Sequence, residues 1–326
     1  MVEREIVQLH LDMRPQTLDD VRHQEAVVGR IKSELKTGTF PHATMFTGSS
    51  GVGKTTVARI LRDELGCDAF DYVEANMADK RGIDEIRSFA SSVGMAPMGK
   101  CRVYVLDECH QITKTGQQAL LKVLEDCPKH AYFILLTSEP TKLIPAVKTR
   151  CSVYKFLAMN RKQSVGFVMQ AACTIGKLTD NDPPKKRQWF NELAETIAEY
   201  CKGSQRMALV MLQSALACAT PAQGLASVES AGGDEKTMMD LFKSIAEKNW
   251  HGCKSILNGM WDTLSDDHEG SRRALLGLAG SALVKGWAKC PNGHVLHIID
   301  CFESNNFDSG RAGFVASVYV ACEGGN

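Results

Sequence analysis

The sequence predicts an α/β core built on a parallel sheet, followed by two regions made only of helices. Up to about residue 158, short unbroken apolar runs alternate with stretches of helical periodicity, a pattern typical of parallel strands joined by crossover helices. After Asn160 the strand pattern stops while the helical pattern continues. A chain of 326 residues is also too long for one small hydrophobic core. We therefore predict an α/β domain over residues 1–158, a small helical domain over 159–222 and an all-α domain over 235–326.

Short apolar runs mark the strands of the α/β domain, and amphipathic stretches mark its helices. The predicted strands are Ala43–Thr47, Tyr72–Ala75, Val103–Leu106, Tyr132–Leu136 and Val153–Phe156. The predicted helices between them are Lys54–Leu65, which ends at Gly66, Ile83–Val93, and Thr115–Glu125, which stops before Pro128.

Helical periodicity accounts for most of the remaining chain. The helices expected in the second region are Arg161–Thr174, Gln188–Cys201 and Gly203–Ala219. Those expected in the third are Glu235–Lys248, Cys253–Leu264, Ser271–Ala288 and Asn292–Phe302. Between these regions, Thr220–Asp234 is rich in Gly, Ser and Ala and contains Pro221. We interpret this stretch as a linker.

The composition excludes several classes of protein. Hydrophobic residues make up 44% of the chain and charged residues 23%, which is ordinary for a globular protein rather than a disordered one. The 12 cysteines stand singly without a CxxC pair, so we expect reduced thiols rather than zinc ligands or disulfides. Residues 1–12 lack the apolar core of a signal peptide, and no apolar run is long enough to span a bilayer. We therefore expect a cytoplasmic protein without membrane contact.

A glycine-rich segment between the first strand and the first helix has the pattern GxxxxGK[ST]. Its glycines allow backbone N–H groups to turn inward onto phosphate oxygens, and the helix N-terminus adds partial positive charge. The Lys54 ammonium can reach the β- and γ-phosphates, and the Thr55 hydroxyl can bind Mg²⁺. The residues expected to bind nucleotide here are Gly48, Ser49, Ser50, Gly51, Val52, Gly53, Lys54, Thr55 and Thr56.

Two carboxylates follow the buried strand Val103–Leu106. A carboxylate at the end of a strand can hold the Mg²⁺ of a phosphate-binding loop, and its neighbour can orient and deprotonate water. We assign Asp107 to the metal and Glu108 to the role of catalytic base. Cys109 and His110 come next but have no partners at the spacing of metal ligands, so we interpret His110 as structural or as lining the edge of the site.

Further segments occur in an order that resembles a known family. Met13–Val21 reads MRPQTLDDV, Pro41–Ala43 precedes the first strand, and Asp107–His110 reads DECH. Over about residues 12–212 this order is similar to the AAA+ ATPases of clamp loaders: bacterial gamma/tau, the small subunits of replication factor C, and phage subunits. The resemblance implies an AAA+ core with a helical lid and an all-α collar. It also implies that Arg14 and Val21 lie at the adenine of bound ATP.

The same resemblance implies roles for three later residues. Ser138, at the end of a predicted strand, stands where the family has its sensor-1 residue. Arg150, in the triplet Thr149–Cys151, stands where clamp loaders have SRC, whose arginine enters the ATP site of the neighbouring subunit. Arg206, in the segment Gly203–Leu209, stands at the sensor-2 position and is expected to contact the γ-phosphate of its own subunit. An added guanidinium of this kind can be worth ~10³–10⁵ in rate.

DNA contacts are expected at the starts of two helices, where N–H groups and basic side chains suit phosphate binding without sequence reading. The net charge is zero, with 38 basic and 38 acidic residues, so such contacts must be local or shared among subunits. The four-cysteine insert of bacterial gamma/tau is absent and Asp79–Asp84 resembles the phage and replication factor C subunits, which together point to a phage protein acting in the host cytoplasm. The residues expected to touch DNA are Lys80, Arg81, Gly82, Ile83, Lys114 and Thr115.

The sequence thus predicts an ATPase subunit of a sliding-clamp loader, with ATP and Mg²⁺ as cofactors. The partners implied by the resemblance are a sliding clamp, primer–template DNA and other loader subunits in a hetero-oligomer expected to be pentameric. Two alternatives stay open at this point. One is another AAA+ machine on DNA, such as a helicase loader or a branch-migration motor, and the other is a structural loader subunit that does not hydrolyse ATP.

Overall fold

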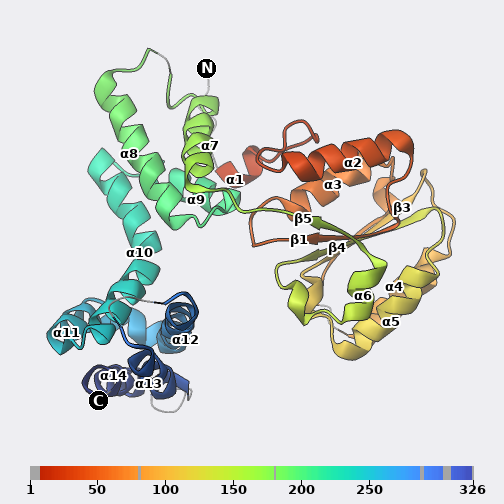
Figure 1. The fold of residues 1–326 in the computed structure, drawn as a ribbon. Coiled ribbons are helices and arrows are strands. Elements are labelled where there is room, and N and C mark those ends of the chain that lie inside the picture. Colours follow the sequence, from red (N-terminus) through yellow and green to blue (C-terminus); the bar gives the residue numbers. More distant parts are fainter. Residues whose placement is uncertain (1–7, 80–81, 180, 287–289, 304–309, 325–326) are drawn as a thin grey trace. The chain divides into compact units, whose positions relative to one another are not determined.

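The computed structural model describes residues 8–79, 82–179, 181–286, 290–303 and 310–324. The chain divides into two compact units, Met1–Val228 and Glu229–Asn326, each of which is described by itself (Figure 1). The domain boundaries at residues 158 and 222, both within the first unit, stay a prediction.

The first unit contains a five-stranded, fully parallel sheet with the strand order β2-β3-β4-β1-β5. Each predicted strand is confirmed, with ends that differ by at most one residue from the prediction. The strands are β1 (Ala43–Thr47), β2 (Tyr72–Asn76), β3 (Arg102–Asp107), β4 (Ala131–Thr137) and β5 (Ser152–Lys155). Because β1 pairs with both β4 and β5, the middle of the sheet is formed by segments far apart in the sequence.

Helices cover both faces of the sheet, which explains why its strands read as unbroken apolar runs. Consecutive residues of a strand point to opposite faces of the sheet, where they join two separate hydrophobic clusters. Met45 and Tyr104 belong to the cluster on one face, and Phe46 and Val105 to the cluster on the other. Helices α2 (Glu25–Thr37) and α3 (Lys54–Glu64) cover the second face, and α4 (Ile83–Val93), α5 (Lys114–Glu125) and α6 (Pro145–Arg150) cover the first (Figure 1). Short 3₁₀ turns lie at Ala69–Asp71 (η1), Cys109–Gln111 (η2) and Pro140–Lys142 (η3).

The rest of the first unit is helical. Its elements are α1 (Leu9–Asp12), α7 (Arg161–Thr174), α8 (Pro184–Tyr200) and α9 (Gln205–Leu216). They share one apolar cluster, in which Leu9 of α1 is fully buried, and the Leu9 N–H donates to Gln213 Oε1 at 2.9 Å. The N-terminal segment is thereby fixed to the helix that carries Arg206.

The predicted linker Thr220–Asp234 is wrong: helix α10 (Pro221–Ala246) runs through most of it. Pro221 occupies the first helical position, where its missing N–H costs nothing. The following Ala, Gln, Leu and Ser residues tolerate helix, and Val228 buries its side chain in the first unit. The glycines and serines that indicated a linker are therefore accommodated inside a helix.

The second unit is all-α and has its own core. It contains the end of α10 with α11 (Trp250–Gly259), α12 (Trp261–Lys285), α13 (Asn292–Glu303) and α14 (Gly310–Glu323). Helix α14 is not among the predicted helices. In the part of the chain that is described, no helix is both long enough and apolar enough to cross a membrane.

Candidate nucleotide site

The phosphate loop joins β1 to α3, and its three glycines have backbone angles that other residues rarely adopt. Gly48 has φ 150°, Gly51 has φ 75° and Gly53 has φ 103°. A Cβ atom on Gly48 would lie 2.5 Å from the Phe156 carbonyl oxygen, and one on Gly51 would lie 2.1 Å from Ser204 Oγ. The loop conformation therefore requires glycine at both positions.

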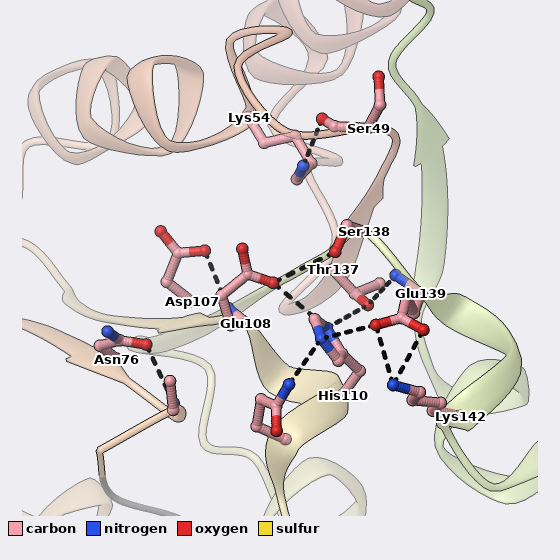
Figure 2. A network of polar contacts seen from close by, with 12 residues as sticks. Ser49, Lys54, Asn76, Asp107, Glu108, His110, Thr137, Ser138, Glu139 and Lys142 are labelled. Atoms are coloured by element: carbon pink, nitrogen blue, oxygen red, sulfur yellow. Dashed lines mark hydrogen bonds and ion pairs between the residues drawn. The ribbon is translucent and has the colours of Figure 1, made fainter. Parts of the chain in front are cut away.

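Lys54 is the first residue of helix α3, and its side chain folds back onto the phosphate loop. Its Nζ donates to the Gly48 carbonyl oxygen at 2.7 Å and to the Ser49 carbonyl oxygen at 2.8 Å, the second of which is drawn in Figure 2. Burial lowers the pKa of Lys54, while the carboxylates of Glu108 and Asp107 raise it and favour the charged form. A buried ammonium at a helix N-terminus is suited to phosphate oxygens, for which it can exchange its carbonyl partners.

The two residues predicted to hold Mg²⁺ meet in the structure. Thr55 Oγ1 donates to Asp107 Oδ2 at 2.9 Å, across the gap between the start of α3 and the end of β3. A hydroxyl and a carboxylate side by side next to a phosphate loop form the oxygen-rich donor set that Mg²⁺ prefers. These residues therefore fit the metal that the sequence implies.

Glu108 follows Asp107 in a strained conformation, with φ 50° and ψ 42°. A non-glycine residue in the left-handed region is uncommon and costs of order 1–3 kcal/mol. The Glu108 N–H donates to Asp107 Oδ1 at 2.8 Å, and Ser138 Oγ donates to Glu108 Oε2 at 3.4 Å (Figure 2). The structure thus brings the predicted base and the predicted sensor-1 residue into contact.

A cavity of about 820 Å³ lies over this arrangement, within the range typical of small-molecule sites. It is lined by the N-terminal segment, the phosphate loop, the ends of β2 and β3, and helices α7 and α9. The predicted residues that reach it are Arg14, Ser50, Gly51, Gly53, Lys54, Thr55, Thr56, Asp107, Glu108 and Arg206.

Positive charge gathers in the cavity. Arg14 Nε donates to Thr56 Oγ1 at 3.1 Å. Burial, followed by the Arg59 and Arg206 guanidinium groups, lowers the pKa of Arg14. Because like charges so close together repel one another, the arginines and Lys54 favour an anionic occupant.

Other predicted residues lie outside the cavity lining. Val52 and Val21 pack in the core beneath the loop. Arg150, at the end of α6, forms an ion pair with Glu125 at the end of α5, with 2.6 Å between Arg150 Nε and Glu125 Oε1. Its side chain is 35% exposed.

Two of the predicted DNA residues, Lys80 and Arg81, fall outside the described residues. Gly82 caps the N-terminus of α4, which begins at Ile83. Lys114 and Thr115 are exposed in the first turn of α5.

Several residues of the site have no signal in the sequence. Gln205 lines the cavity and donates from Nε2 to the Arg22 carbonyl oxygen at 3.1 Å. Arg59 and Glu74 also line it and form an ion pair at 2.6 Å. These contacts join separate segments of the chain, so no local sequence pattern predicts them.

The fold and the site together define a P-loop nucleotide-binding protein of the AAA+ class. Solved structures of the same fold include the RuvB Holliday junction branch migration motor of Thermotoga maritima, with a TM-score of 0.53 and 18% identity over 70% of this chain and 79% of that one. The sequence comparisons add that the chain is similar to AAA+ ATPase subunits of clamp loaders.

Three matches carry this relationship. The family model described as DNA polymerase III, delta subunit, matches residues 70–160. The chain is 28% identical over 269 residues to DNA polymerase III subunit tau of Escherichia coli, which covers 75% of this chain and 40% of that protein. It is 33% identical over 206 residues to the replication factor C small subunit of Methanothermobacter thermautotrophicus, covering 62% of this chain and 61% of the relative. The chain thus spans well under two thirds of the tau proteins that it matches.

Proposed function

We propose that this chain is an ATPase subunit of a sliding-clamp loader. In this role ATP binding drives clamp opening and binding of primer–template DNA, and hydrolysis releases the clamp on DNA. The observation that carries the proposal is one cavity holding a phosphate loop, a Thr55–Asp107 pair and Glu108, in a chain similar to tau and replication factor C subunits.

Six side chains in and beside the cavity have a proposed part in ATP hydrolysis. Lys54 and the loop N–H groups bind the phosphates, and Arg206 adds a guanidinium from α9. Thr55 and Asp107 would hold Mg²⁺, which neutralises charge on the phosphates. Glu108 orients the attacking water and accepts its proton, while Ser138 holds Glu108 in place through Oε2.

Arg150 has a proposed part in a neighbouring subunit. It lies outside its own cavity lining and half-exposed at the end of α6, where it can reach another chain. Its ion pair with Glu125 shields the charge in the single chain. We propose that the loader is a pentameric hetero-oligomer and that a neighbouring subunit binds at this surface.

The DNA contact is proposed at the exposed starts of α4 and α5, together with Lys80 and Arg81. Lys114 and Thr115 present a basic side chain and free helix-start N–H groups. Replacement of Lys114 by alanine should therefore lower the dependence of DNA binding on salt concentration, because one phosphate contact is lost. An unchanged salt slope would place the DNA surface elsewhere.

The alternatives have less support. The likeness to the branch-migration motor is one of fold alone, since the identity is 18%. A structural subunit without hydrolysis does not require Lys54, Thr55, Asp107 and Glu108 to come together as they do.

The test is steady-state ATP hydrolysis by the assembled loader. We expect turnover to rise when clamp and primed DNA are added together, and to fall by roughly 10²-fold or more in Glu108→Gln while ATP binding is retained. Glu195→Gln, an exposed change on α8, is the matched control. Turnover near the wild-type level in Glu108→Gln would refute the assignment of the base.

A further inference from the structure

His110 is a buried histidine between two carboxylates, and the proposed hydrolysis does not yet use it. Its side chain is 4% exposed. Nδ1 lies 3.3 Å from Glu108 Oε2, and Nε2 lies 3.3 Å from Glu139 Oε1 (Figure 2). Glu139 in turn is paired with Lys142, at 2.9 Å from Oε2 to Nζ. A chain of polar contacts therefore runs from the end of β3, through η2, to the segment after β4.

Each ring nitrogen also has a neutral partner. Thr137 Oγ1 lies 3.2 Å from Nδ1, and Gln111 Nε2 lies 3.1 Å from Nε2. A neutral imidazole has one donor and one acceptor nitrogen. With the proton on Nδ1, the ring donates to Glu108 and accepts from the Gln111 amide. With the proton on Nε2, it donates to Glu139 and accepts from the Thr137 hydroxyl.

The first arrangement leaves Glu108 in the geometry that a base needs. Ser138 Oγ and His110 Nδ1 both approach the same oxygen, Oε2. The other oxygen points away from them, to the side on which Lys54 lies (Figure 2). A carboxylate held by one oxygen keeps the second free to accept a proton.

We propose that His110 is a positioning residue that orients Glu108 through Nδ1 and connects it, through Glu139, to the segment after β4. This inference rests on the proposed function, because it gives Glu108 the role of base. Glu139 is suited to its part: the hydrogen bond from Lys142 lowers the pKa of Glu139, so its carboxylate is ionised at neutral pH.

The kinetic test uses the assembled loader with clamp and primed DNA. His110→Ala should lower kcat by roughly 10- to 100-fold, a part of the ~10²–10⁴ that general-base catalysis contributes, with KM for ATP changed less than about twofold. His110→Asn places an amide donor near the position of Nδ1 and should restore part of the loss. In a Glu108→Gln background, His110→Ala should cause no further loss, since it acts through Glu108.

His130→Ala is the control, because His130 is another histidine of the α/β domain, half-buried, and its Nε2 bonds to the Val93 carbonyl oxygen away from the cavity. A kcat for His110→Ala equal to that of the control would overturn the inference, as would an equal loss in the Glu108→Gln background. If wild type hydrolyses ATP and Glu108→Gln does so much more slowly but measurably, either result refutes the role of His110 alone. If wild type fails to hydrolyse ATP, the proposed function itself is refuted.

A second measurement needs no activity. In the ¹⁵N spectrum of the full chain without nucleotide, assigned by loss of the signal in His110→Asn, Nδ1 should carry a proton. Glu108→Ala should shift the His110 signals. An unprotonated Nδ1, or His110 signals that Glu108→Ala leaves unmoved, would overturn the proposed contact independently of any kinetics.

Discussion

Gly51 is the residue at which the phosphate loop meets the helical part of the first unit. Its carbonyl oxygen accepts from the Arg206 N–H at 3.3 Å, and Ser204 stands against its Cα. Arg206 is thereby placed at the cavity by a backbone contact rather than by its own side chain. Glycine is needed here because φ is positive and because Ser204 lies too close to leave room for a Cβ atom.

Replacing Gly51 by alanine should therefore damage both stability and nucleotide binding. The positive φ costs of order 1–3 kcal/mol, and the new Cβ forces Ser204, and with it Arg206, away from the loop. We expect lower stability in urea unfolding and weaker binding of a fluorescent ATP analogue.

The control is Gly29→Ala, at an exposed position of α2 where an added Cβ would meet no atom within 4 Å, and this change should stabilise the chain by about 0.5–1 kcal/mol. Adding Ser204→Ala to Gly51→Ala should return part of the affinity, because the contact is relieved. Wild-type affinity in Gly51→Ala would show that the loop does not need this conformation.

The residues of the site that the sequence identified without any resemblance are those of two local motifs. Lys54, Thr55, Asp107 and Glu108 follow strand ends that meet at one edge of a parallel sheet, so their meeting could be predicted. The bonds of His110 to Glu139 and of Gln205 to Arg22 could not, because they depend on how separate loops pack.

At the scale of elements, the start of β3 is held by a buried ion pair. Asp71, at the end of η1, is 1% exposed and accepts from the N–H groups of Met98 and Gly99 and from the Arg102 guanidinium at 2.9 Å. The loop between α4 and β3 is thus fixed to the edge strand β2. Hydrogen bonds from the Gly99 N–H and from Arg102 lower the pKa of Asp71.

Asp71→Asn should destabilise the chain by about 3 kcal/mol at neutral pH, because it leaves Arg102 without its charged partner. The pKa of Asp71 is lower in the folded state, so its contribution is full above the ordinary aspartate value of about 4 and is lost as the pH falls below it. In urea unfolding at several pH values, the difference in free energy of unfolding between wild type and variant should become smaller as the pH falls.

Asp84→Asn, whose carboxylate is exposed beside Arg87, should change stability by less than about 1 kcal/mol at any pH. The ion-pair explanation would be contradicted if the difference in free energy of unfolding between wild type and Asp71→Asn stayed constant down to pH values at which Asp71 is protonated.

The strands could be predicted because both faces of the sheet are covered. Several helices were missed, among them α2 and α6, and two of the missed segments, the first part of α10 and all of α14, show why. Most of α10 was hidden by residues typical of linkers. Helix α14 contains Val and Tyr, which favour strands, yet Phe314, Val318, Ala321 and Cys322 lie on one buried face at helical spacing. Packing of this face against α12 and α13 favours the helix over a strand.

At the scale of the whole molecule, the site in one chain is expected to lack an arginine that another chain supplies. Arg150→Ala should bind ATP and assemble, since the phosphate loop is untouched, but hydrolysis in the assembly should fall by roughly 10³-fold. Lys148→Ala, on the same helix, is the control.

Mixing Arg150→Ala with Lys54→Ala should then restore some activity, because one chain supplies a site and the other the arginine. If demonstrated mixed assemblies hydrolyse no more ATP than the two variants measured separately, Arg150 does not act in a neighbouring subunit.

The pairing of β1 with β4 and β5 has a consequence for synthesis on the ribosome. The strand that leads into the phosphate loop is translated early, but β4 follows roughly 80 residues later and β5 roughly 100 residues later, a delay of about 4–20 s at ~5–20 residues per second. Until then β1 is an apolar segment without a place in a sheet, and closing so long a loop is slow. A nascent chain arrested before β5 therefore carries every residue of the phosphate loop and still has no site for a nucleotide.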